Sequence, residues 1–203
     1  MWKFERIYRE LILSSLNQIS LVRQEEIASK CMVSLGLVNK TVKKLEAAMA
    51  VEATRNGVRV LSPARLLNLW AAERDVSKDI WQSFRLDPFT EVEKSIPKDA
   101  IFTAFSGWFM TSGRKPAEYD RTYFYVTNRE SFNLWLGFRK GKIRKTNPNV
   151  FAIYVGDEHL IRSSKKGVAC VPQVYVDIYS INGPEAPPFL RDIGTTYPSL
   201  SIW

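Results

Sequence analysis

The chain has few of the residues on which catalytic and metal centres usually depend. It contains one histidine, His159, and two cysteines, Cys31 and Cys170, which lie far apart in the sequence. Because the cysteines have no metal-type spacing, we interpret both as reduced, buried thiols. A catalytic triad or a multi-histidine metal centre would need the single histidine at an essential position. We therefore expect no catalytic residues, no metal ligands and no cofactor, although the C-terminal half leaves an enzymatic alternative open.

Long apolar runs are also absent. No stretch approaches the roughly 20 apolar residues that a membrane-spanning helix needs. The first six residues, Met1-Trp2-Lys3-Phe4-Glu5-Arg6, carry charge throughout and lack the apolar stretch and cleavage site of a signal peptide. A glycine-rich nucleotide-binding loop is missing too, because Thr111–Lys115 contains a single glycine. We expect a cytoplasmic protein without a membrane partner.

What the chain does contain is enough apolar material for a core, together with an excess of positive charge. Hydrophobic residues make up 45% and charged residues 25% of the sequence, the usual mix of a globular protein. There are 29 Lys plus Arg against 21 Asp plus Glu, a formal net charge of +8. This balance favours a polyanionic partner only weakly, since many proteins with no nucleic-acid role are equally basic. The placement of the charges is therefore more informative than their sum.

The sequence changes character at Leu61-Ser62-Pro63, after which aromatic residues appear in strand-like runs. We predict a first domain over residues 1–62, a connecting element over 63–79 and a larger second domain over 80–203. Ser62 followed by Pro63 is typical of a helix start, with the serine as N-cap and the proline at the first helical position. A helix over residues 63–74 is therefore expected to join the two domains.

The first domain begins with two short helical patterns. Apolar residues recur at three- and four-residue intervals and form one stripe on a first helix: Phe4, Ile7, Tyr8, Leu11 and Ile12. The charged residues between them are expected to face water: Lys3, Glu5, Arg6, Arg9 and Glu10. A second helix is predicted from about Arg23 to Lys30, with Ile27 and Ala28 directed inward.

A third helix, from a Ser34 N-cap to about Met49, separates apolar from basic residues. Its predicted apolar seam consists of Leu35, Val38, Val42, Leu45 and Met49. At about 100° per residue, the opposite face carries an amide and three ammonium groups: Asn39, Lys40, Lys43 and Lys44. The small residues Gly36 and Ala47 keep this face narrow, and Glu46 falls beside the seam. This face of the helix therefore carries positively charged residues and no carboxylate.

Two short strands, Val51–Thr54 and Val58–Leu61, follow the third helix and are joined by Arg55-Asn56-Gly57. Asn-Gly favours the positive φ angles that such a tight turn demands. Three helices and a hairpin in about sixty residues form the layout of a winged helix-turn-helix. In that layout the third helix fits a major groove of about 12 Å, and the hairpin reaches an adjacent phosphate or the minor groove.

The predicted DNA contacts follow from this layout. They are Ser34, Asn39, Lys40, Thr41, Lys43, Lys44, Arg55 and Arg59. The lysines are expected to neutralise phosphates, the two hydroxyl groups to hydrogen-bond phosphates, and Asn39 to contact a base edge. The alternative is a solvated basic helix in a module that is used for protein contacts.

Beyond residue 80, four runs rich in β-branched and aromatic residues are predicted to be strands. They are Ile101–Phe105, Thr122–Val126, Val150–Val155 and Gln173–Tyr179. A short helix is predicted over Arg129–Leu136, and another apolar turn follows Pro187, with Phe189, Leu190 and Ile193. This mixture predicts an α+β (mixed α/β) fold, in which the larger α/β domain is built on a central mixed sheet. The strand order is left open.

The second domain also contains the densest positive patch of the chain. It consists of Arg139, Lys140, Lys142, Arg144 and Lys145. A charge run of this length is usually a solvated, flexible hairpin between packed elements. A second phosphate contact, or a contact with an acidic protein, is the alternative.

Asp177 stands inside an apolar run, and a buried carboxylate needs a partner. A metal-dependent nuclease would need a second carboxylate and usually a lysine nearby. Asp157 and Glu158 are candidates for the second carboxylate, but no Asp/Glu-x-Lys motif follows on a strand. We interpret Asp177 as structurally paired or at a strand end rather than catalytic, and His159 as an exposed loop residue.

Two stretches of the chain resemble the AbiEi family of type IV antitoxins, which includes similar transcriptional regulators. The first runs through Val33–Glu46, the hairpin and Val60–Ala71, with its leucine-leucine-x-x-tryptophan-alanine helix. The second is Pro172–Tyr179, which carries an aspartate as that family's late strand does. The chain departs from the family over residues 181–188, where three prolines stand in place of a more regular helix.

The resemblance implies a winged helix joined to an α/β domain, binding of operator DNA and repression of the protein's own promoter. It implies groove and backbone contacts by Ser34, Asn39, Lys40, Lys43 and Lys44, with Arg55 and Arg59 on the wing. Some relatives also restrain a nucleotidyltransferase-type toxin, which is therefore a candidate partner here.

Three functions are compatible with these patterns. The leading hypothesis is a transcriptional regulator that binds double-stranded DNA. The second is a DNA-processing enzyme with a metal-dependent C-terminal domain acting through Asp177. The third is a toxin-neutralising protein-interaction module, which is compatible with the first. Twofold operators suit a homodimer or two monomers side by side, so the oligomeric state is left open.

Overall fold

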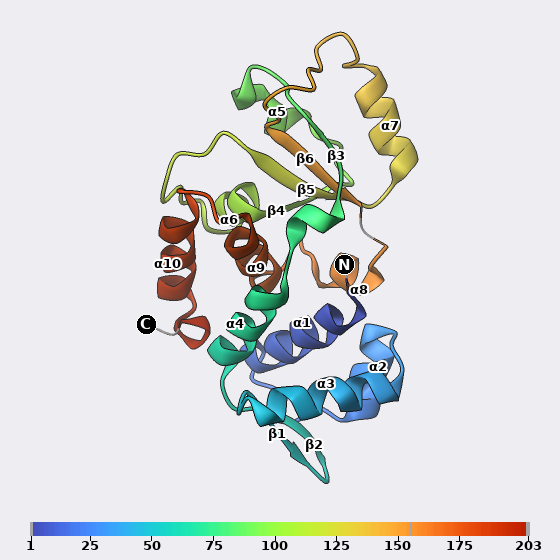
Figure 1. Cartoon of the computed structure of the whole chain (residues 1–203), viewed down its shortest axis with the longest axis vertical. Coiled ribbons are helices and arrows are strands. Elements are labelled where there is room, and N and C mark those ends of the chain that lie inside the picture. The colour runs from blue at the N-terminus through green and yellow to red at the C-terminus, as the bar shows by residue number, and fades with distance from the viewer. Residues whose placement is uncertain (1, 155, 202–203) are drawn as a thin grey trace. The chain divides into compact units, whose positions relative to one another are not determined.

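The computed structural model describes residues 2–154 and 156–201, and it has an α+β fold, as the mixture of predicted helices and strands indicated (Figure 1). The first elements in chain order are α1 (Lys3–Leu16), α2 (Gln24–Cys31), α3 (Leu35–Ala47), β1 (Val51–Thr54), β2 (Gly57–Val60) and α4 (Pro63–Glu73). There follow η1 (Val76–Asp79), β3 (Ile80–Phe84), α5 (Phe89–Ser95), β4 (Ile101–Thr103), α6 (Ala104–Ser112) and β5 (Thr122–Val126). The chain continues with α7 (Arg129–Gly137), β6 (Val150–Tyr154), α8 (Glu158–Ser163), α9 (Val171–Ile181), α10 (Ala186–Thr196) and η2 (Pro198–Leu200).

The chain divides into two compact units. The first contains the residues up to Arg74 together with the segment from Arg191 onward, and the second is Asp75–Leu190. The sequence placed a boundary at residue 62 and treated α4 as a connector. In the structure α4 packs against α1, and Leu66, Leu67 and Trp70 are buried in the first unit. The C-terminal η2 also packs against α4, which brings the end of the chain back to the first unit.

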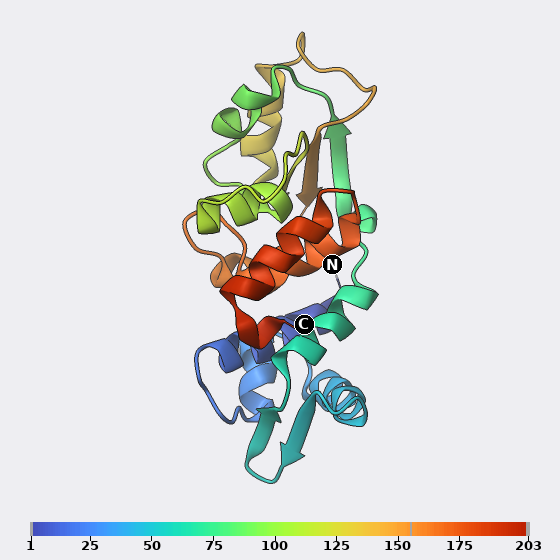
Figure 2. The same cartoon turned by 90° about the vertical axis from the view of Figure 1, so that its left-hand side faces the viewer.

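The first unit combines α1, α2 and α3 with a two-stranded antiparallel hairpin. Val51 pairs with Val60 and Thr54 with Gly57. The predicted N-caps are confirmed, because the Ser34 hydroxyl oxygen accepts from the Leu37 N–H at 3.2 Å, and that of Ser62 accepts from the Arg65 N–H at 3.2 Å. In both views α3 lies beside the hairpin (Figure 1, Figure 2).

Several side chains of the first unit differ from the predicted burial. The apolar stripe of α1 is confirmed at Ile7, Tyr8, Leu11 and Ile12, which are buried, while Phe4 is half-buried. Glu5 and Arg9, however, do not face water: both are buried, because the face of α1 that carries them also packs against other elements.

The predicted seam of α3 is wrong at its two ends. Leu35 and Met49 are exposed, whereas Val38, Val42 and Leu45 are buried. The helix ends at Ala47, and Met49 has a left-handed φ of 53°, which takes its side chain off the helical stripe. Leu35 is the first residue of the helix, before the buried part of the seam begins.

The second unit is built on a four-stranded mixed sheet in the order β3-β6-β5-β4. The two central strands, β5 and β6, are parallel, and each edge strand is antiparallel to its neighbour. Phe124 and Val126 of β5 pack into a core with Phe132 and Trp135 of α7. Because alternate residues of a strand point to opposite faces, Tyr125 faces the other side, where it contacts α9. Every residue of β5 is buried between these layers.

The run Gln173–Tyr179 is the largest error of the sequence prediction. It lies in helix α9, with Pro172 in the first turn, and not in a strand. Val174, Val176 and Asp177 are all buried, so the helix is covered on more than one side. The polar residues Gln173, Asp177 and Ser180 recur at helical intervals, but the β-branched and aromatic residues between them imitate a buried strand.

Smaller differences concern the ends of elements in the second unit. The strand predicted over Ile101–Phe105 ends at Thr103, because α6 begins at Ala104. The strand predicted over Val150–Val155 is confirmed from Val150 to Tyr154, and Val155 lies outside the described residues. The helix predicted over Arg129–Leu136 is confirmed as α7, whose N-cap is Asn128. The apolar turn after Pro187 is part of α10.

The predictions for the single histidine and for one of the two cysteines also need correction. His159 is buried in α8 rather than exposed in a loop. Cys31 is buried as expected, but Cys170 is only half-buried, and neither cysteine forms a disulfide. In the described part of the chain, no helix combines the length and apolarity that crossing a bilayer requires.

Candidate nucleic-acid interface

The exposed face of α3 carries the basic residues that the sequence singled out. Asn39, Lys40, Lys43 and Lys44 are all exposed, while Val38, Val42 and Leu45 are buried on the opposite side. One helix therefore holds a hydrophobic seam in the core and a polar, basic face in solvent. The separation follows from the helical repeat, since residues three and four positions apart share a face.

The three lysines of this face differ in their electrostatic surroundings. Lys44 Nζ lies 2.6 Å from Glu73 Oε1 of α4 and 6.0 Å from the centre of the Phe4 ring. Among residues 2–154 and 156–201, neither Lys40 nor Lys43 has a carboxylate within ion-pair distance. Lys40 and Lys43 therefore present uncompensated positive charge to solvent, whereas the charge of Lys44 is partly neutralised.

Glu73 links α4 to two neighbours. Besides the ion pair with Lys44, the Tyr8 hydroxyl donates to Glu73 Oε1 at 3.1 Å. Burial of the ring, followed by the negative charge of Glu73 and this hydrogen bond, raises the pKa of Tyr8 above its ordinary value. Tyr8 is therefore a neutral donor at physiological pH, and Glu73 stays available to balance Lys44.

Thr41 does not belong with the predicted contacts. It is 5% exposed, and its hydroxyl donates to the Leu37 carbonyl oxygen at 2.8 Å. The residue lies on the core side of α3, between the exposed face and the seam, and its one hydroxyl proton is used inside the helix. Ser34, by contrast, is exposed, and its hydroxyl only accepts in the cap, so its proton is free to reach a phosphate.

The hairpin turn is held in place by local hydrogen bonds. The Thr54 hydroxyl donates to the Gly57 carbonyl at 3.0 Å and accepts from the Asn56 N–H at 3.2 Å. Gly57 has a φ of +145°, and a Cβ atom there would lie 2.7 Å from the Val22 carbonyl oxygen. The predicted hairpin is confirmed, but its turn consists of Arg55 and Asn56, which are exposed, and Gly57 is the first residue of β2. Asn56 does not have the predicted positive φ, and Gly57 has one.

One polar cleft brings together the turn and the start of two helices. It is lined by Arg23, Gln24, Glu25, Leu35, Asn39, Thr54, Arg55, Asn56 and Gly57. Two of the predicted contacts, Asn39 and Arg55, therefore share one depression of the surface. Arg59 lies elsewhere on the hairpin, exposed and 3.5 Å from Glu52 Oε2 on the paired strand.

Sequence reasoning missed Arg23 as a member of this cleft. Arg23 is exposed at the start of α2, the position at which the sequence placed the beginning of the second helix. Its neighbour Val22 forms two backbone hydrogen bonds with Val58, at 3.0 and 2.8 Å, which fasten the start of α2 to the hairpin. Spacing along the chain gave no signal for this, because the two segments are more than thirty positions apart.

The second basic patch lies in the turn after α7 and is largely exposed. Lys140, Lys142, Arg144 and Lys145 are exposed, whereas the Arg139 guanidinium lies 4.7 Å from the centre of the Trp135 ring and donates to the Ser95 carbonyl. Arg144 forms an ion pair with Asp87. A pair of backbone hydrogen bonds joins Arg144 to Arg85. The patch is thus anchored at both ends and keeps three lysines in solvent.

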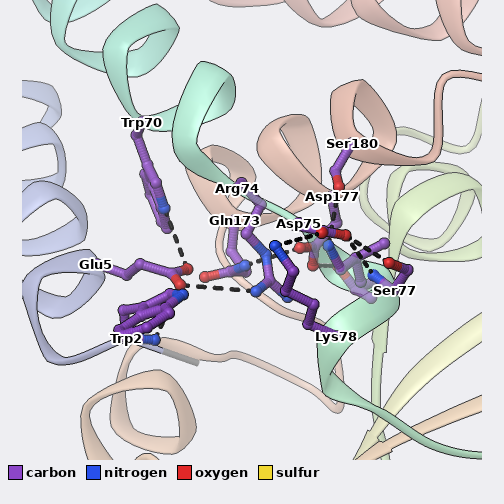
Figure 3. A network of polar contacts seen from close by, with 12 residues as sticks. Trp2, Glu5, Trp70, Arg74, Asp75, Ser77, Lys78, Gln173, Asp177 and Ser180 are labelled. Atoms are coloured by element: carbon purple, nitrogen blue, oxygen red, sulfur yellow. Dashed lines mark hydrogen bonds and ion pairs between the residues drawn. The ribbon is translucent and has the colours of Figure 1, made fainter.

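Asp177 is the centre of a buried polar cluster in the second unit, and the prediction of structural pairing is confirmed. It accepts hydrogen bonds from Thr103 Oγ1 at 2.6 Å, Tyr125 OH at 2.5 Å and Gln173 Nε2 at 3.0 Å. Figure 3 shows Gln173 and Asp177 side by side on α9. The cluster ties two strands of the sheet to the helix. Among the described residues, no group of three or more His, Cys, Asp or Glu side chains is placed to hold a metal ion.

A separate buried cluster supports the first unit. Glu5 accepts from Trp70 Nε1 at 3.2 Å and lies 3.6 Å from Arg74 NH1, with both charged side chains almost completely buried (Figure 3). The Arg9 guanidinium lies 5.6 Å from the centre of the Trp70 ring. These contacts explain why two charged residues of α1 are buried: each has a partner on α4 or beside it.

Comparison with known proteins finds no matching family model, no matching curated protein and no matching solved structure. The residues themselves therefore carry the functional interpretation.

Proposed function

We propose that this protein is a DNA-binding transcriptional regulator whose first unit acts as a winged helix-turn-helix. The observation that supports it most directly is the two-sided character of α3. Asn39, Lys40 and Lys43 are exposed on one face, while the opposite face is buried in the core. The exposed face ends at a cleft that it shares with Arg55 of the hairpin turn.

The dimensions and chemistry of this face suit duplex DNA. An α-helix with its side chains is about 10–12 Å wide, which matches the major groove of B-DNA. The ammonium groups of Lys40 and Lys43 would neutralise phosphates, and the Asn39 amide can both donate to and accept from an adenine edge. The hairpin turn, with Arg55 at its tip, would contact the flanking backbone. Arg59 would add a weaker contact, since Glu52 balances its charge.

The resemblance to the AbiEi family makes an autorepressor the specific form of this proposal. In this form, the protein binds operator DNA at its own promoter. Affinity falls steeply with salt, because each neutralised phosphate releases counterions, with a slope of about −0.9 per contact on duplex DNA.

A second candidate function, compatible with the first, is supported by an apolar surface on the second unit. Phe138 is 85% exposed and Leu134 is 66% exposed, one helical turn apart at the end of α7. They lie beside the second basic patch, and Phe138 lines a cleft together with Arg139 and Lys142. Exposed apolar patches are typical of interaction sites, and aromatic residues and arginine are enriched in protein interfaces. We propose a protein partner for this surface, for which the resemblance suggests a nucleotidyltransferase-type toxin.

This second candidate is tested by co-expression with the product of a neighbouring gene. Phe138→Asp should abolish co-purification of a partner that the wild-type chain retains, while DNA binding by the same variant stays normal. Equal recovery of the partner with both chains would reject this surface.

An enzymatic function of the C-terminal domain has less support. Asp177 is engaged with Thr103, Tyr125 and Gln173 inside the core, and Asp157 caps α8 through the His159 and Leu160 N–H groups. Both carboxylates have a sufficient structural explanation, and we do not assign them a reaction.

Charge reversal of the lysines tests the DNA-binding proposal. A variant with Lys40, Lys43 and Lys44 all replaced by Glu should lose duplex binding in a gel-shift assay. Its thermal stability should fall only modestly, because all three side chains are exposed and the one ion pair that is lost, Lys44–Glu73, is open to solvent. Normal duplex binding by this folded triple variant would reject the role of α3.

A further inference from the structure

The cleft between α2, α3 and the hairpin turn has the composition of an anion-binding site. Arg23 and Arg55 both line it, from elements that only the fold brings together. Asn39, the amide of the exposed face of α3, lines the same cleft. Arginine binds phosphate oxygens through two parallel N–H groups, and an amide can contact a base edge beside that phosphate.

Both guanidinium groups are available to a ligand. Arg23 precedes α2 as its N-cap residue, but its side chain makes no capping hydrogen bond. Across residues 2–154 and 156–201, neither Arg23 nor Arg55 has a hydrogen-bond acceptor or a carboxylate paired with its side chain. Glu25, exposed in the first turn of α2, also lines the cleft, so two positive charges face one negative charge there.

The backbone fixes the position of Arg23 relative to the turn. Val22, the preceding residue, exchanges hydrogen bonds with Val58 in both directions, and Gly57 allows this close approach because it has no Cβ atom. Arg23 therefore cannot drift away from the hairpin without breaking these two hydrogen bonds. A positively charged side chain on a backbone that is held in this way costs less ordering on binding than one on a free loop.

We propose that this cleft is a binding site for one phosphodiester group of the DNA backbone, with Arg23 as a contact equal in importance to Arg55. The proposal rests on the proposed function, since the phosphodiester belongs to the duplex whose major groove α3 enters. Arg23 and Arg55 bind the phosphate oxygens, and the bound phosphate sets the depth at which Asn39 meets the base edges. Glu25 opposes the phosphate and tempers the affinity.

The test measures binding of a labelled mixed-sequence DNA duplex by fluorescence anisotropy over a series of salt concentrations. Arg23→Ala should weaken binding several-fold and reduce the slope of log K against log salt by about 0.9, the value for one phosphate contact. Arg23→Lys should keep the slope, because the charge remains, and lose part of the affinity with the forked geometry. Glu25→Gln should strengthen binding. Arg162→Ala, which removes an exposed arginine of the second unit, is the matched control and should change neither quantity.

The outcomes separate this proposal from the proposed function. If the wild-type chain binds the duplex and Arg23→Ala binds with unchanged affinity and slope, the cleft assignment is wrong while the role of α3 stands. If the wild-type chain does not bind duplex DNA at any salt concentration, the proposed function fails and the cleft assignment with it. Should Arg23→Ala fail to fold by circular dichroism, Arg23→Gln and Glu25→Gln still decide. Arg23→Gln keeps a polar side chain without the charge and should lower the salt slope in the same way, and Glu25→Gln keeps the side-chain length and should strengthen binding.

Discussion

Lys44 of α3 and Glu73 of α4 form an ion pair of 2.6 Å, and the same Glu73 oxygen accepts from the Tyr8 hydroxyl. The basic face of α3 is therefore uneven. Lys40 and Lys43 are exposed to solvent without a carboxylate partner among the described residues, while Lys44 is paired with Glu73. The sequence alone would treat the three lysines as equivalent.

The unequal lysines lead to a graded binding prediction. Lys40→Ala and Lys43→Ala should each weaken duplex binding and lower the salt slope by about 0.9. Lys44→Ala should have a smaller effect, because Glu73 already neutralises part of its charge. Glu73→Gln should strengthen binding by releasing Lys44, and Tyr8 can still donate to the amide oxygen. Anisotropy titrations at several salt concentrations measure the affinity of all four variants. If Lys44→Ala loses as much affinity as Lys43→Ala, the Lys44–Glu73 ion pair does not reduce the contribution of Lys44 to binding.

Gly57 is predicted to be irreplaceable for a steric reason. Its φ of +145° is unfavourable for any L side chain, and an added Cβ atom would meet the Val22 carbonyl oxygen at 2.7 Å. Gly57→Ala should destabilise the first unit by about 2 kcal/mol or more and weaken DNA binding, because the turn and Arg23 both lose their position.

Gly36→Ala is the matched control for this substitution. Gly36 lies in the first turn of α3, and an added Cβ atom there meets no heavy atom within 4 Å. Alanine should stabilise the helix by about 0.5–1 kcal/mol, as alanine does relative to glycine in a helix. Chemical denaturation of both variants measures the contrast, and equal stability of the two would show that the turn tolerates a side chain.

Asp177→Asn is predicted to affect stability rather than DNA binding. The carboxylate accepts hydrogen bonds from Thr103, Tyr125 and Gln173 in the core, and an asparagine amide nitrogen in place of one oxygen would face a donor instead of accepting from it. A buried donor left without an acceptor costs about 1–3 kcal/mol. Thermal unfolding should therefore move to lower temperature. Duplex affinity of the folded variant should match that of the wild-type protein, and a selective loss of affinity at normal stability would point to a functional Asp177 instead.

Alkaline pH should destabilise the protein through its buried tyrosines. Burial, followed by a nearby carboxylate, raises the pKa of Tyr8 and of Tyr119, with Glu73 and Glu93 as the respective carboxylates. In the unfolded chain a tyrosine ionises at about pH 10, so the unfolded state loses its proton first as the pH rises. The stabilisation is thus complete below about pH 10 and decreases above it.

The measurement for this prediction is the free energy of unfolding as a function of pH, from neutral to alkaline. Tyr119→Phe should flatten the alkaline decline, although it also loses the hydrogen bond to Glu93 Oε1 and starts from a lower stability. An equally steep decline in Tyr119→Phe would place the alkaline sensitivity elsewhere.

Local chemistry explains which predictions from the sequence were confirmed. Ser34 and Ser62 cap their helices, and a hairpin forms around Arg55-Asn56, because each signal depends on residues within three positions. The α3 face was also predictable, since the helical repeat alone separates Lys40 and Lys43 from Val38 and Val42.

Predictions that depended on distant neighbours were wrong or incomplete. Asp177 is buried inside α9 because Thr103 and Tyr125 of the sheet, far along the chain, supply its partners. Glu5 is buried because Trp70 and Arg74 meet it, and no pattern in α1 shows this. Arg23 was missed since only the pairing of Val22 with Val58 brings it to the turn.

By itself, the sequence determined the helix starts, the hairpin, the α+β class and the basic outer face of α3. Caps, turns and helical periodicity are properties of short segments and hold wherever the segment is placed. The tertiary structure alone decided which charges are compensated, which polar side chains enter the core and which residues share the cleft at the hairpin. Those properties depend on how close two side chains lie in space. The packing of the whole unit sets that distance, and the separation of the two residues along the chain does not predict it.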